Sequence, residues 1–206
     1  MKKSNDSTTE QLILEIAENL FLEKGFALTS TTEIARIAGC NQALVHYYFR
    51  TKEQLFNEIF GKYANLFVSV FLEKMDDTLS FEENVRKKAE AHYDILKANP
   101  KLPFLFFNEL NTNPERLTVF KEKTGELPAT LLGQMDLALK GEIEKGTIRP
   151  MTASDLVLTI FSLNLGLFLA APVLKVFAGV NETEFQSYVE NRKRENVTII
   201  LKSLRP

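Results

Sequence analysis

Side chains that can recognise the edges of base pairs are concentrated in residues 29–55, TSTTEIARIAGCNQALVHYYFRTKEQL. A glutamine in the first turn of a helix can form two hydrogen bonds to adenine, and histidine and tyrosine can donate to phosphate oxygens. Gln42, His46 and Tyr47 place these groups close together in the sequence. The pattern favours contact with a nucleic acid.

Two short helices must position these side chains. A capping-box pattern at Ser30 opens a helix over residues 31–38, and Asn41 is suited to cap a further helix over residues 42–49. Gly39 lies between them, where a left-handed turn residue is expected. Two short helices joined by a turn that contains glycine are typical of a helix-turn-helix, whose second helix can enter the major groove.

The same stretch resembles the tetracycline-repressor (TetR) family of bacterial regulators. The resemblance is carried by Ser30, Glu33-Ile34-Ala35, Ala38-Gly39-Cys40, Asn41, His46-Tyr47-Tyr48-Phe49, Lys52-Glu53 and Leu55. Residues 56–206 match the family only in length and helical character. The chain departs from the family pattern at Thr32, at Gln42 and in the order of His46 and Tyr47. These departures concern the operator sequence and not the fold.

The resemblance and the helical spacing together define the expected DNA contacts. Gln42 would read a base, its neighbours would meet thymine methyl groups, and Lys52 would add charge to a helix N-terminus that already favours phosphate. The full set is Thr31, Thr32, Asn41, Gln42, Ala43, Leu44, His46, Tyr47 and Lys52. For Gln42, a plain solvent-exposed role is the alternative. Val45, Tyr48 and Phe49 are expected in the core, and Cys40 is expected to be a buried small hydrophobe.

The composition restricts the chemistry further. The 206 residues are 45% hydrophobic and carry a net charge of −2, so a basic coat for nucleic acid is absent and any DNA binding must be local. Residues 1–50 contain five Lys or Arg and six acidic residues. One cysteine, two histidines and no recognisable nucleophile–base set or phosphate loop predict no catalytic residues, no metal site and no cofactor, and therefore no enzyme.

Helical spacing dominates the whole chain, and strand alternation is absent. The sequence therefore predicts an all-α protein of about nine helices, with the first over residues 8–24 and one bent helix over residues 114–145. We expect a three-helix DNA-binding domain over residues 1–51, followed by a larger helical ligand-binding and dimerisation domain over residues 52–206.

Sixteen phenylalanines and no tryptophan suggest an aromatic cavity in the second domain. A cavity of this kind would suit a small, largely apolar effector, whose identity the sequence leaves open. The expected lining is Phe67, Phe71, His92, Phe104, Phe107, Asn108, Phe120, Asn164 and Phe168. The alternative is that these side chains simply fill the core.

The uncharged stretch 156–174 has about the length of a membrane span. Asn164 and Pro172 interrupt it, so we expect a buried helix that forms a homodimer with the last helix, and no membrane partner. The N-terminus lacks the apolar region of a signal peptide, which favours the bacterial cytoplasm. The resulting hypothesis is a homodimeric repressor that binds a palindromic operator and is released by its effector. A helical protein-interaction or membrane-associated module without DNA binding is the alternative.

Overall fold

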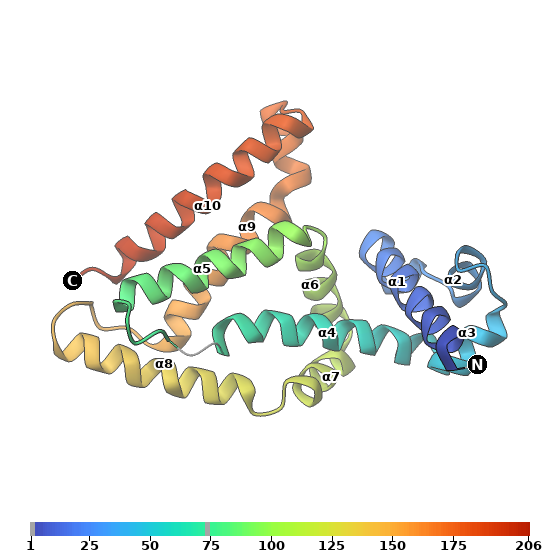
Figure 1. The fold of residues 1–206 in the computed structure, drawn as a ribbon. Helices are drawn as coiled ribbons and strands as arrows, with labels where there is room; N and C mark the ends of the chain where they lie inside the picture. Colours follow the sequence, from blue (N-terminus) through green and yellow to red (C-terminus); the bar gives the residue numbers. More distant parts are fainter. Residues whose placement is uncertain (1–2, 73–74) are drawn as a thin grey trace. The chain divides into compact units, whose positions relative to one another are not determined.

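The computed structural model describes residues 3–72 and 75–206, and the regular elements within these ranges are all α-helices (Figure 1). The ten described helices are α1 (Lys3–Leu28), α2 (Thr31–Ile37), α3 (Gln42–Phe49), α4 (Lys52–Leu72), α5 (Phe81–Ala98), α6 (Leu102–Thr112), α7 (Pro114–Thr124), α8 (Leu127–Glu144), α9 (Ala153–Ala178) and α10 (Glu182–Leu204). The all-α expectation is confirmed.

Local sequence sets most helix ends. The Thr152 side chain accepts from the Asp155 N–H while the Asp155 carboxylate accepts from Thr152, so a capping box starts α9. Asn181 and Glu184 start α10 in the same way. Gly179 ends α9 with a φ of 62°, a left-handed conformation that glycine adopts without steric cost.

Two expected helix boundaries differ from the structure. The single bent helix over residues 114–145 is wrong, because Gly125 adopts a φ of 55° and separates α7 from α8. The first helix begins at Lys3 and not at residue 8. At its other end, Gly25 has a φ of 79° and a ψ of 174°, which interrupts the helical backbone where the sequence predicted a stop.

The chain divides into two compact units. Unit 1 comprises Met1–Asn65 and Leu105–Lys123, and unit 2 comprises Leu66–Phe104 and Thr124–Pro206. Unit 1 thus adds much of α6, all but the last residue of α7, and the first two-thirds of α4 to the three N-terminal helices. The expected boundary at residue 51 remains a prediction about where the DNA-binding function ends.

Unit 1 has an aromatic core. Phe21, Phe56 and Phe60 are buried, and the Phe21 and Phe56 ring centroids lie 4.9 Å apart in an edge-to-face arrangement. Phe60 stacks on Phe106 with 4.3 Å between centroids. Edge-to-face and stacked ring pairs add stabilisation beyond the area that they bury. This core joins α1, α4 and α6.

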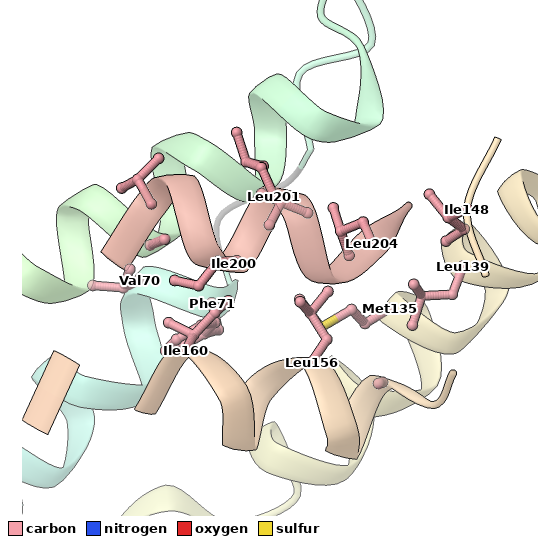
Figure 2. Packing of buried hydrophobic residues seen from close by; sticks show 14 of the residues in the cluster. Val70, Phe71, Met135, Leu139, Ile148, Leu156, Ile160, Ile200, Leu201 and Leu204 are labelled. Carbon is pink, nitrogen blue, oxygen red and sulfur yellow. The ribbon is translucent and has the colours of Figure 1, made fainter. Parts of the chain in front are cut away.

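Unit 2 is built around α9, which packs against α5, α8 and α10. Figure 2 shows Leu156 and Ile160 of α9 in one cluster with residues of α4, α8 and α10. Among the described helices, α9 alone has the length and hydropathy of a membrane span. Leu156 and Ile160 are fully buried, however, so α9 serves as the central helix of this unit's core.

Candidate nucleic-acid interface

Helices α2 and α3 form the expected helix-turn-helix. Ser30 caps α2 by accepting from the Glu33 N–H, and the Asn41 side chain caps α3 by accepting from the Leu44 N–H at 2.8 Å. Gly39 has a φ of 67°, so the turn uses the left-handed residue that the sequence predicted. These caps satisfy backbone donors that would otherwise lack partners at the start of each helix.

The inner faces of α2 and α3 are buried, as expected. Ile34 and Ala35 of α2 and Val45 and Phe49 of α3 are each at most 5% exposed. Tyr48, which was also expected in the core, is only half-buried. Cys40 is only half-buried, which corrects the expectation of a fully buried thiol, because it lies in the turn and not on the inner face of either helix.

The outer face of α3 is open to solvent. Gln42, Ala43, His46 and Tyr47 are exposed, and Tyr47 is 75% exposed. Leu44 is half-buried. Four of the expected contact residues therefore lie on the free side of a helix whose other side anchors it, which is the arrangement that groove insertion requires.

A chain of hydrogen bonds orders this face. The Gln42 Nε2 lies 2.9 Å from the Thr31 Oγ1 and 3.3 Å from the His46 Nε2, and the His46 Nδ1 lies 2.8 Å from the Arg50 carbonyl oxygen. Because a carbonyl only accepts, the His46 Nδ1 is the donor in its contact with Arg50, and in that tautomer Nε2 is the acceptor for the Gln42 amide. The glutamine amide then donates to both neighbours, which orders its side chain before any ligand arrives.

Lys52 has a different environment from the one expected. Its Nζ donates to the carbonyl oxygens of Phe26 and Thr29, each at 2.9 Å, and lies 4.1 Å from the Phe26 ring centroid. The ammonium therefore stabilises the end of α1. Sequence reasoning missed this role because both acceptors lie more than 20 residues earlier in the chain.

Thr31, Thr32 and Asn41 lie at the two helix starts, as expected. Thr32 and Asn41 are exposed, and Thr31 is half-buried beneath the Gln42 amide. These positions gather around the exposed face of α3, so the structure brings eight of the nine expected residues onto one surface region and directs the charged end of the ninth, Lys52, to α1.

The family model for "Bacterial regulatory proteins, tetR family" matches residues 13–59, which cover the helix-turn-helix and parts of α1 and α4 on either side of it. This chain belongs to the TetR family of transcriptional regulators. It is therefore a DNA-binding regulator and not an enzyme, which excludes a module without DNA binding.

Similarity to TetR-family proteins extends along the chain. The HTH-type transcriptional regulator RutR of Escherichia coli K12 is 26% identical over 97% of this chain and 92% of RutR. The hemolysin II regulator HlyIIR has a crystal structure with a TM-score of 0.65 and 24% identity, covering 98% of this chain and 99% of that one. The fatty acid degradation regulator FadR of Bacillus halodurans has a TM-score of 0.63 at 18% identity, over 95% of this chain and 99% of that one. Both structures share the fold of the whole chain.

A cavity of about 410 Å³ lies within unit 2 of this TetR-family protein. It is lined by Phe71, Met75, Asp77, Lys88, Leu131, Gln134, Met135 and Ala138. Phe71 is the one member of the expected ligand set among these lining residues. The Lys88 Nζ, which is almost buried, donates to the Phe71 carbonyl at 3.1 Å. The cavity thus combines an apolar wall with one cation and one carboxylate.

Four other expected ligand residues lie inside unit 2. The His92 ring centroid is 6.1 Å from that of Phe67 and 5.6 Å from that of Phe71, and Asn164 donates to the His92 Nδ1 at 3.2 Å. Phe168 packs against Tyr93. His92 is completely buried, and this burial lowers its pKa to about 4. His92 is therefore neutral at physiological pH, with Nε2 as the nitrogen that carries the hydrogen.

The remaining expected ligand residues lie elsewhere. Phe104 is 69% exposed and Phe107 is 45% exposed, and Asn108 is also exposed. These side chains lie on the outer face of α6 because Leu105 and Phe106 occupy its buried face. Phe120 of α7 is half-buried. The expectation that these four line a common cavity with Phe71 is not met.

Proposed function

We propose that this TetR-family regulator is a homodimeric repressor of the bacterial cytoplasm that binds a palindromic operator and leaves it when a small, largely apolar effector binds. The observation that carries the proposal is the exposed, ordered face of α3. Gln42 donates both amide hydrogens to Thr31 and His46, and its amide oxygen, which neither bond uses, can accept a hydrogen bond from a base edge on the solvent side. A side chain ordered in advance loses less entropy when it binds.

The dimer is supported by apolar side chains on α9 that face solvent. Leu169, Val173 and Val176 lie at helical spacing and are 41%, 56% and 80% exposed. A stripe of this kind on a helix whose other side is core favours an isologous contact with a second copy. Two copies would present two α3 helices, which suits half-sites about one DNA turn apart.

Effector control is supported by the cavity in unit 2. Its volume of about 410 Å³ falls in the range of small-molecule sites. We place the effector against Phe71, Leu131 and Met135. An effector that binds more tightly to a dimer with wrongly spaced α3 helices would shift the population away from the DNA-binding state.

The operator is tested by fluorescence anisotropy on duplexes that tile the DNA upstream of the chain's own gene. We expect one segment with inverted repeats to bind the dimer more tightly, by about 1,000-fold or more, than a shuffled duplex of equal length. Equal affinity for both duplexes at every salt concentration would overturn the proposal.

The effector is tested by native mass spectrometry of the purified dimer, which detects a ligand that remains bound. The expected result is a bound small molecule that lowers operator affinity when added back. The Leu131→Trp variant, which fills the cavity, should retain operator binding and lose this response. A response that survives filling of the cavity would contradict the assigned site.

A further inference from the structure

Arg116 of α7 is a charged side chain buried to 1% exposure. Its Nε donates to the Glu109 carboxylate of α6 at 3.1 Å, and its Nη1 donates to the Glu53 carboxylate of α4 at 2.8 Å. Asn57 of α4 accepts from the same Nη1 at 2.5 Å. All four residues belong to unit 1. One guanidinium therefore joins three helices that are separated by up to 63 positions in the sequence.

The same guanidinium packs on two aromatic rings. Its Cζ lies 4.8 Å from the Phe26 ring centroid and 4.4 Å from the Phe56 centroid. Cations at these distances are attracted to the ring electrons, more strongly where water is excluded. Phe26 follows the interruption of α1 at Gly25, in the segment that leads to α2.

Lys52 and Arg116 hold this segment together. Both cations contact the Phe26 ring, and Lys52 also binds the Phe26 and Thr29 carbonyl oxygens. Thr31 begins α2 two residues later and contacts Gln42 of the recognition helix. The position of the ordered α3 face therefore depends on where this segment is fixed.

We infer that Arg116 is a positioning residue for operator binding. It holds the start of α4 and the end of α1 against α6 and α7. As a result, the helix-turn-helix moves together with α6 and α7 as one body. This inference rests on the proposed operator binding. A lysine at position 116 keeps the charge but lacks the planar fork that reaches Glu109, Glu53 and Asn57 together.

The first test measures operator affinity of Arg116→Lys and Glu53→Gln, on the upstream duplex that the wild type binds. Titration to saturation gives the active fraction, so that misfolded protein is not counted as weak binding. We expect about tenfold weaker binding for Arg116→Lys, because an ammonium cannot reach all three partners at once. We expect about threefold weaker binding for Glu53→Gln, because the guanidinium then loses one of its two carboxylate partners. Glu53 is half-exposed, so its variant folds even where Arg116→Lys does not.

The matched control is Asp94→Asn in unit 2. The Asp94 carboxylate pairs with Lys193 at 2.7 Å and is exposed to the same degree as Glu53. Its loss should change operator affinity by less than about twofold, because exposed pairs contribute little. Operator affinity that is unchanged in Arg116→Lys and Glu53→Gln, or lowered equally in all three variants, would overturn the inference.

The second test does not depend on an operator. Amide hydrogen exchange in Glu53→Gln should accelerate by about threefold or more in residues 26–37 and stay unchanged in α5. Equal acceleration in both regions would indicate a general loss of stability and would contradict a positioning role. A wild type that binds no upstream duplex would instead overturn the proposed function, and the exchange result would still decide the role of Arg116.

Discussion

Some residues have contact partners that are near in the sequence, and others have partners that are far away in it. The role of Asn41 as a helix cap could be predicted because its partner, the Leu44 N–H, is three residues away. The role of Lys52 could not, because its carbonyl acceptors belong to a segment on another helix. The order of the Gln42 side chain likewise depends on Thr31, which only the folded turn brings within 2.9 Å.

Gln42→Ala should weaken operator binding by about 1–3 kcal/mol, the range for one base-reading side chain. The melting temperature should stay within a degree or two, because Gln42 is exposed and surface substitutions rarely change stability by more than about 0.5 kcal/mol. Fluorescence anisotropy and thermal denaturation measure the two effects. Gln186→Ala on α10 is the control, and an equal loss of affinity there would contradict a base-reading role for Gln42.

His92 makes stability depend on pH in a defined direction. It is neutral in the folded protein, where burial lowers its pKa to about 4, and it takes up a proton below about 6.5 when the chain unfolds. The unfolded state therefore binds more protons between these values, and the free energy of unfolding falls as the pH drops from about 6.5 to 4. The loss should reach up to about 3 kcal/mol.

Urea denaturation of the wild type and of His92→Gln, at several pH values from about 7.5 to 4, gives the free energy of unfolding as a function of pH. The difference in slope between the two proteins measures the contribution of His92. The variant cannot titrate at this position, so its curve should fall less steeply over the same interval. Parallel curves would show that the proton uptake belongs to other groups.

At the scale of elements, the sequence predicts helix type well and helix faces less well. The phenylalanine content marked Phe104 and Phe107 of α6 as candidates for a cavity lining, yet both are exposed, whereas Phe106 beside them is buried. Adjacent residues on a helix point about 100° apart, and only the neighbouring helices decide which of them is inside. Where a glycine takes a left-handed conformation, as Gly125 does, also depends on packing on both sides.

The exposed stripe of α9 leads to a prediction for this helix. Val173→Glu should convert the proposed dimer to monomers, because a carboxylate at the centre of an apolar contact loses its hydration without gaining a partner. Sedimentation velocity should then show a particle near the 23.4 kDa mass of one chain, and operator affinity should fall with it. Leu137→Glu, on α8 at 74% exposure, is the matched control and should remain dimeric.

At the scale of the whole molecule, charge sets how this regulator meets DNA. The net charge of −2 provides no general attraction to phosphate, so affinity must come from a few cations near α3. Lys24 is paired with Glu33, and Lys52 is bound to carbonyl oxygens. Arg36 and Arg50 are exposed in the same region, so the proposed dimer has four exposed arginines there that can contact phosphates.

A shallow dependence on salt follows from this charge distribution. Four arginines per dimer predict a slope of about −4 in a plot of log affinity against log salt, and the lysines at positions 2 and 3 could extend it to about −7 if all of them reach phosphates. Anisotropy titrations of the operator duplex over a series of KCl concentrations measure the slope. Arg36→Gln should reduce its magnitude by about 2 per dimer while leaving base preference unchanged. A slope well beyond about −7 would contradict this charge distribution, because further cations such as Lys24 or Lys52 would then have to leave their partners and neutralise phosphates.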